Sequence, residues 1–209
     1  PQVGAVHALL AHWTVSAAPA TVIMPTGSGK TETMLALLAH ERPRICLVVV
    51  PSVALRHQIA RKFESFGLLK PLDLLSAHAI NPVVGTVGGH LDVAEATSML
   101  NSCNVIVATM SSLSGSAPGA RQLLAESIDL LLLDEAHHVP ARTWLELRDR
   151  AVDASCRVVQ FTATPFRGDR KLVTGKVAYR YPLSKAQEDG LFTEVRYQAV
   201  FELDPNQAD

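Results

Sequence analysis

The sequence of 209 residues lacks a strong net charge, because its 19 lysine and arginine residues nearly balance its 20 aspartate and glutamate residues. A formal net charge of −1 provides no global positive field of the kind that attracts nucleic acid. Any binding of nucleic acid must therefore use a local patch. The sequence also lacks an apolar run of membrane-spanning length and a recognisable signal peptide. We therefore expect a cytoplasmic protein with no membrane partner.

Cysteines are few as well, and their positions argue against the common cysteine-based sites. Cys46, Cys103 and Cys156 are odd in number, lie far apart and form no CxxC pair. We interpret them as buried thiols in a reducing compartment rather than as metal ligands or disulfide partners. Repeats and low-complexity segments are also absent. The 48% of residues that are hydrophobic suffice for the core of one compact domain.

What the sequence does contain is a regular alternation of short apolar runs and helical patterns. The apolar runs are β-branched or leucine-rich without polar alternation, which is typical of strands buried on both faces. The predicted strands are 20–23, 45–50, 83–87, 105–108, 130–133 and 158–161. The predicted helices are 3–12, 30–39, 52–65, 91–100, 117–127 and 141–151. This alternation predicts an α/β fold with a mainly parallel central sheet and helices on both faces.

The pattern changes near the carboxyl end. A polar, basic stretch at 167–171 is followed by a short strand, a helix near 184–189 and a strand near 195–201. Residues 204–209 have the composition of a linker or a cut end, so we assign residues 1–203 to one domain.

Residues 24–31, MPTGSGKT, follow the first predicted strand and open a predicted helix, which is the position of a phosphate-binding loop. In the full pattern, G-x-x-x-x-G-K-[ST], the first position is occupied by Met24 here. Gly29, Lys30 and Thr31 match the pattern. The alternative reading is a glycine turn that caps a helix and carries a surface lysine.

The chemistry of this loop depends on its glycines and on the helix that follows. Gly27 and Gly29 allow backbone N–H groups to turn towards an anion at the positive end of the helix. Lys30 is predicted to reach the β- and γ-phosphates, and the Thr31 hydroxyl to bind Mg²⁺. The predicted nucleotide-binding residues of the loop are Thr26, Gly27, Ser28, Gly29, Lys30 and Thr31.

Residues 128–138, IDLLLLDEAHH, place two acids directly after a strand of leucines. Ligands of open α/β sheets bind at the carboxyl ends of strands, so we expect Asp134 and Glu135 beside the phosphate loop. Asp134 suits a Mg²⁺ site, either as a direct ligand or through a metal-bound water, and Glu135 suits the base that orients and deprotonates an attacking water. The alternative, that both acids only cap the next helix, leaves the joint presence of the two motifs unexplained. We therefore predict an NTPase site.

Together with FTATPFR at residues 161–167, these two motifs make the chain resemble the first RecA-like domain of superfamily 2 helicases and translocases. Within that superfamily it is most similar to the DEAD/DEAH-type group of type III restriction enzyme motor subunits and DNA-repair helicases. The resemblance implies a three-layer RecA-like P-loop domain, ATP and Mg²⁺ as cofactors, and nucleic acid as partner, with DNA favoured. It also implies a second RecA-like domain of a longer protein, absent from this chain, and nuclease or repair subunits as further candidate partners.

The resemblance assigns roles to residues outside the phosphate loop. Gln2, one helix before the loop, matches a glutamine that reads the adenine edge. Segments 48–58 and 107–113 match motifs that touch the nucleic-acid backbone, where hydroxyls, helix-start N–H groups and arginines grip phosphates. The residues so implied are Pro51, Ser52, Arg56 and Thr109, with Gly89 as a further candidate. For Gly89, a plain turn is an equal alternative.

The TATP segment is predicted to couple the nucleotide to the nucleic acid. Thr162 and Thr164 leave a buried strand beside the DEAH segment, where their hydroxyls can hydrogen-bond to it and relay the state of the γ-phosphate. The resemblance makes His137 part of this relay and of the catalytic set. We interpret its neighbour His138 as structural, and the remaining histidines show no metal-ligand spacing.

These motifs predict the ATPase domain of a helicase or translocase. Its activity in isolation is expected to be low, because no arginine finger is visible in the chain. A second possibility is an ATP-regulated nucleic-acid- or protein-binding module with little turnover of its own. A third is an unrelated P-loop enzyme such as a small-molecule kinase, which would have no use for the DEAH and TATP segments.

Overall fold

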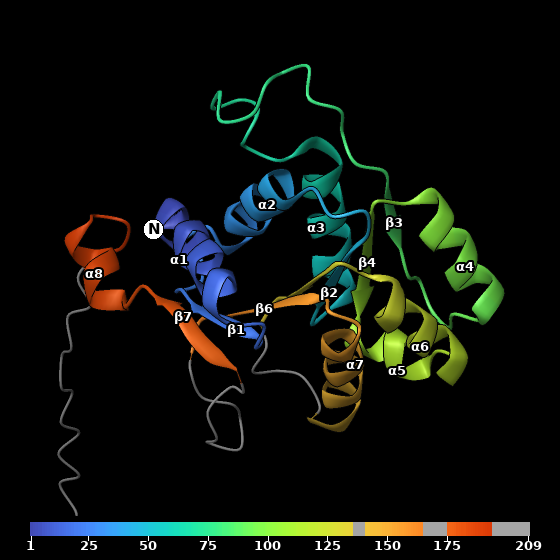
Figure 1. Ribbon diagram of the computed structural model, residues 1–209. Coiled ribbons are helices and arrows are strands. Elements are labelled where there is room, and N and C mark those ends of the chain that lie inside the picture. Colours follow the sequence, from blue (N-terminus) through green and yellow to red (C-terminus); the bar gives the residue numbers. More distant parts are fainter. Residues whose placement is uncertain (136–140, 165–174, 194–209) are drawn as a thin grey trace, which may run out of the picture.

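The computed structural model describes residues 1–135, 141–164 and 175–193, which fold around one central sheet (Figure 1). Seven strands lie in the order β3-β4-β2-β5-β6-β1-β7, and every neighbouring pair is parallel. The strands are β1 (Ala20–Ile23), β2 (Cys46–Val50), β3 (Val84–Thr86), β4 (Val105–Thr109), β5 (Leu130–Leu133), β6 (Arg157–Thr162) and β7 (Lys176–Arg180). The prediction of a mainly parallel sheet is confirmed.

Helices cover both faces of this sheet. In the described part of the chain they are α1 (Gln2–Val15), α2 (Lys30–Glu41), α3 (Val53–Ser65), α4 (Val93–Ser102), α5 (Met110–Gly115), α6 (Pro118–Ser127), α7 (Ala141–Asp153) and α8 (Leu183–Glu188). Figure 1 shows α1, α2 and α3 above the sheet and α5, α6 and α7 below it. None of the helices among the described residues is long and apolar enough to cross a bilayer.

Two hydrophobic cores fill the spaces between the sheet and its helices, and the strand residues contribute to them alternately. In β2, Cys46, Val48 and Val50 belong to the core between the sheet and α1, α2 and α3. Leu47 and Val49 belong to the core between the sheet and α4 to α7. Every residue of β1, β2, β4 and β5 is buried, which explains why their sequences are continuous apolar runs. The result is the three-layer arrangement expected from the sequence.

The predicted elements agree with the structure, with one omission and small shifts at the ends. The helix α5 was not predicted, because its sequence, MSSLSG, has the composition of a loop. It forms because Thr109 caps it: the Thr109 hydroxyl accepts a hydrogen bond from the Ser112 N–H, and the Ser112 hydroxyl accepts one from the Thr109 N–H. The short strand and helix predicted late in the chain are β7 and α8.

Three predicted segments of the fold lie outside the described residues. They are the polar stretch at 167–171, the strand near 195–201 and the terminal segment at 204–209.

The parallel sheet gathers the predicted functional segments at one edge. Because all strands point the same way, their carboxyl ends meet there, and five of them end in Ile23, Val50, Thr109, Leu133 and Thr162. The phosphate loop, both segments assigned to nucleic-acid contact, the acidic pair and the TATP segment each follow one of these ends. The edge is therefore the candidate functional site.

Candidate nucleotide site

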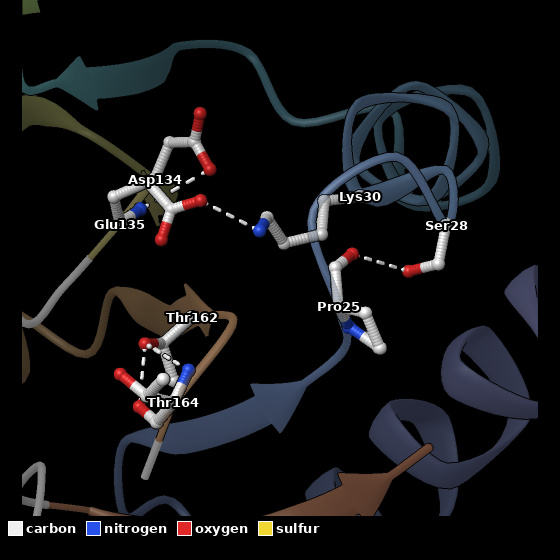
Figure 2. Close-up of polar contacts among 7 residues, drawn as sticks. All are labelled: Pro25, Ser28, Lys30, Asp134, Glu135, Thr162 and Thr164. Carbon is white, nitrogen blue, oxygen red and sulfur yellow. Dashed lines mark hydrogen bonds and ion pairs between the residues drawn. The ribbon is translucent and has the colours of Figure 1, made fainter. Parts of the chain in front are cut away.

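The phosphate loop begins as a continuation of β1 and then closes into a tight turn. Met24 is buried, and its N–H donates to the carbonyl of Thr162 at 2.9 Å, which keeps it in register with β6. The carbonyl of Pro25 accepts hydrogen bonds from the N–H of Ser28 at 3.2 Å and from its hydroxyl at 2.7 Å (Figure 2). Gly27 and Gly29 have φ of 84° and 91°, a left-handed conformation in which a side chain is strained. The two glycines are therefore required by the turn itself.

Gln2, at the start of α1, supports this turn from a distant part of the chain. Its side-chain N–H donates to the carbonyl of Ser28 at 2.8 Å. A β-carbon added to Gly29 would lie only 2.1 Å from Gln2 Nε2, so the glutamine packs directly on the loop. The structure thus places Gln2 next to the predicted nucleotide-binding residues. Its proposed reading of the base remains a prediction.

The acidic pair meets the loop across β6, because β5 and β1 are both neighbours of that strand. Lys30 Nζ lies 2.6 Å from Glu135 Oε1, and the two side chains are only 9% and 16% exposed (Figure 2). Asp134 is also buried, and its carboxylate accepts a hydrogen bond from the N–H of Glu135 at 3.1 Å. Two motifs far apart in the sequence therefore form one polar cluster.

Glu135 is held in an unusual backbone conformation. Its φ is 50°, in the left-handed region that residues other than glycine rarely adopt. Strained backbone is common at functional sites as well as in turns, and here the carboxylate is directed at Lys30.

Burial, as the largest cause, and the neighbouring charge of Glu135 together raise the pKa of Asp134 to about 6, against the opposing effect of Lys30. An ionised carboxylate in this place is unfavourable without a cation. The Asp134 carboxylate and the Thr31 hydroxyl, at the start of α2, are hard oxygen donors of the kind that Mg²⁺ prefers. The other ligands of the metal would be phosphate and water. The residues present therefore fit a Mg²⁺ bound together with a nucleotide.

The raised pKa predicts how one substitution changes stability with pH. Because the pKa of Asp134 is about 6 in the native state and 3.8 is the ordinary pKa of an aspartate, as in the unfolded chain, the native protein loses stability as pH rises through this interval. Asp134→Asn is therefore expected to stabilise the ligand-free protein above pH 6, by on the order of 1–3 kcal/mol. Near pH 4 the difference should vanish.

Urea unfolding at pH 4 and pH 7.5 measures this effect. Asp153→Asn, which changes an exposed acid at the end of α7, is the matched control and should show no such pH dependence. An equal effect of Asp134→Asn at both pH values would contradict the interpretation.

The TATP threonines lie at the same edge. Thr162 is fully buried, its hydroxyl donates to the carbonyl of Thr164 at 2.7 Å, and it accepts from the Thr164 N–H at 3.2 Å (Figure 2). These bonds form a turn directly after β6. His137 lies outside the described residues, so its role in the relay remains a prediction.

The residues assigned to nucleic-acid contact fall into two groups. Pro51, Ser52 and Gly89 are exposed, and a β-carbon on Gly89 would meet no atom within 4 Å. Arg56 is only 5% exposed, and its guanidinium donates to the carbonyl of Val87.

The hydroxyl groups in these segments are also engaged with the backbone. Ser52 caps α3 by accepting from the Leu55 N–H at 3.3 Å, and Thr109 is 1% exposed and caps α5. Arg56 and Thr109 therefore shape the surface here rather than project from it, a distinction that the sequence pattern does not carry.

The fold and this site define a RecA-like domain of the helicase type. Comparison with protein-family models shows the particular family. The family model described as "Type III restriction enzyme, res subunit" matches residues 1–167, and the chain belongs to this family. The resemblance inferred from the motifs is confirmed. The comparison with curated proteins found no match.

Solved structures share the fold at low sequence identity. The nuclease-deletion mutant of the type ISP restriction-modification enzyme LlaGI, in complex with a DNA substrate mimic, is 17% identical with a TM-score of 0.58, over 91% of this chain and 20% of that chain. The Hef helicase domain of Pyrococcus furiosus is 21% identical with a TM-score of 0.54, over 77% and 33%. The UvsW helicase of bacteriophage T4 is 14% identical with a TM-score of 0.53, over 78% and 52%. The matches thus span about a fifth to a half of those chains.

Proposed function

We propose that this chain is the ATP-binding motor domain of a nucleic-acid-dependent ATPase, which couples ATP hydrolysis to movement on DNA. The observation that carries the proposal is the ion pair of 2.6 Å between Lys30 and Glu135. It joins a glycine turn that can hold phosphates to an acidic pair that can hold a metal ion and a water. Membership of the restriction enzyme motor family and the DNA-bound relative LlaGI support the assignment of ATP and DNA.

Each residue of the cluster has a distinct part in this proposal. The N–H groups of residues 27–31 surround the phosphates, and Lys30 exchanges Glu135 for the β- and γ-phosphates. Asp134 and Thr31 would hold Mg²⁺, which would neutralise the charge that develops on the phosphates. Glu135, released from Lys30, accepts a proton from the attacking water.

Gln2 is suited to recognise the base. Its Nε2 atom is occupied by the Ser28 carbonyl, whereas its amide oxygen makes no hydrogen bond among the described residues. That oxygen can accept a hydrogen bond from the amino group of adenine.

The nucleic acid is proposed to lie along the carboxyl edge of β2, β3 and β4. Pro51, Ser52 and Gly89 are exposed there, Arg56 holds the segment before Gly89 through the Val87 carbonyl, and Thr109 caps α5. Thr162 and Thr164 connect this edge with the nucleotide site, together with His137. Contacts of this type bind the backbone rather than the bases, so binding is expected to be independent of sequence.

The test is ATP hydrolysis with and without DNA or RNA, with the chain alone and with the second RecA-like domain that the family resemblance implies. Slow turnover alone and DNA-stimulated turnover with the second domain support a motor, because an arginine finger contributes about 10³–10⁵ in rate. Stimulation should fall steeply as salt rises, since backbone contacts release counterions. Nucleotide-dependent DNA binding without stimulated turnover would instead identify a regulated binding module.

A further inference from the structure

An aromatic side chain from the far end of the described chain lies beside the phosphate loop. A β-carbon placed on Gly27 would lie 3.7 Å from Cζ and 3.8 Å from Cε1 of Phe192. Sequence neighbours of Gly27 aside, no other described residue comes within 4 Å of that point. The ring edge of Phe192 therefore lies next to the turn that is proposed to hold the phosphates, with room for little more than one methyl group between them. The distance in sequence between the two residues explains why no motif indicated that they are close.

The segment that carries Phe192 starts beside the phosphate loop. β7 pairs with β1, and the N–H of Tyr181 donates to the carbonyl of Ile23, directly before the loop, at 2.8 Å. The Tyr181 hydroxyl then donates to Asp189 Oδ2 at 2.7 Å, which ties the end of α8 back to the end of β7. The chain from β7 to α8 is therefore anchored at both ends.

The turn after α8 is held by further hydrogen bonds. The N–H of Leu191 donates to the carbonyl of Ala186 at 2.9 Å, and the side chain of Gln187 donates to the carbonyl of Thr193 at 3.2 Å. Gly190 takes a φ of 73°, which reverses the chain. Phe192 stands between Leu191 and Thr193 in the sequence, and its side chain is partly buried against the core beneath α1, α2 and α3. Its position on Gly27 is therefore set by its own surroundings.

The phosphate loop needs such support because glycine backbones are free to adopt many conformations. Gln2 fixes the loop by its hydrogen bond to the Ser28 carbonyl. The ring of Phe192 lies beside Gly27 and limits the space into which this glycine can move. A loop held in its binding conformation before the ligand arrives loses less entropy on binding, so its affinity is higher.

We propose that Phe192 is a positioning residue of the nucleotide site, which holds Gly27 in the conformation that binds phosphate. This role rests on the proposed function, since it concerns the same loop. Phe192 acts through the loop backbone and so influences every ligand that carries the phosphate chain. The segment from β7 to Phe192 thereby becomes a structural part of the nucleotide site.

The experiment measures the affinity of two probes, Mg·ADP and inorganic tripolyphosphate, by isothermal titration calorimetry. Phe192→Ala is expected to weaken both by about tenfold, the size of effect that loss of loop preorganisation produces. Phe192→Leu, which retains apolar bulk, should recover most of the affinity for both. Leu191→Ala is the matched control, because Leu191 is 49% exposed in the same turn, and it should leave both affinities unchanged.

Tyr181→Phe tests the same idea without shortening Phe192. It removes the hydrogen bond to Asp189 and should weaken both probes by a smaller factor, which keeps the proposal testable if Phe192→Ala does not fold. Parent-like affinity for both probes in Phe192→Ala and Tyr181→Phe would overturn the role of Phe192, provided that Lys30→Ala still loses binding. A loss confined to Mg·ADP would also overturn it, because Phe192 would then contact the base. A parent protein that binds neither probe would overturn the proposed function and this role together.

Discussion

Lys30→Ala is expected to weaken the binding of Mg·ATP by about 10- to 100-fold, because hydrogen bonds to charged groups contribute about 1.5–3 kcal/mol. The Lys30 ammonium is the cation that the structure places beside the phosphate loop, on the first turn of α2. Without it, the backbone N–H groups and Mg²⁺ hold the phosphates alone. Isothermal titration calorimetry with a non-hydrolysable ATP analogue measures the change.

Two control variants separate this effect from a general change of charge or fold. Lys62→Ala removes a lysine of α3 that also pairs with a glutamate, Glu32 of α2, at 2.7 Å, but is not part of the phosphate loop. This variant should retain the parent affinity. The double variant Lys30→Met with Glu135→Gln removes both charges of the ion pair together and should fold but bind weakly. Parent-like affinity of folded Lys30→Ala would rule out the proposed phosphate site.

Glu135→Gln is expected to lower ATP hydrolysis by about 10²–10⁴, the usual contribution of a general base. The substitution keeps the size of the side chain and removes the charge that accepts the proton. It also frees Lys30 from its partner at 2.6 Å, so the affinity for Mg·ATP should stay equal to that of the parent or rise. Single-turnover hydrolysis with DNA and the second RecA-like domain, beside an equilibrium binding measurement, separates the two effects.

The matched control is Glu126→Gln, which changes an exposed carboxylate on α6 away from the site. It should leave both hydrolysis and binding unaffected. Hydrolysis by Glu135→Gln at the parent rate would show that another group activates the water.

The sheet and the centre of the site follow from the sequence because both depend on local patterns. Continuous apolar runs such as 130–133 have one stable place, a strand covered on both faces, and the structure puts β5 there. Parallel strands share one carboxyl edge, so the segments around Lys30 and Glu135 had to meet there. Their ion pair shows that they do.

The sequence does not show contacts and helix caps that leave no motif and no hydrophobic periodicity. Arg56 has the place of a phosphate-binding arginine in its motif, yet its guanidinium is buried against the Val87 carbonyl. Helix α5 escaped prediction because a capping box, and not a hydrophobic period, starts it at Thr109. The position of Phe192 beside Gly27 depends on the course of the chain through β7 and α8.

A crystal structure of the chain with Mg²⁺ and a non-hydrolysable ATP analogue tests the central claim most directly. The account predicts the phosphates within residues 27–31, Mg²⁺ between Thr31 and Asp134, and Lys30 Nζ moved from Glu135 to the β- and γ-phosphate oxygens. A nucleotide bound elsewhere would contradict it. So would phosphates in the loop with the Lys30–Glu135 pair still at 2.6 Å.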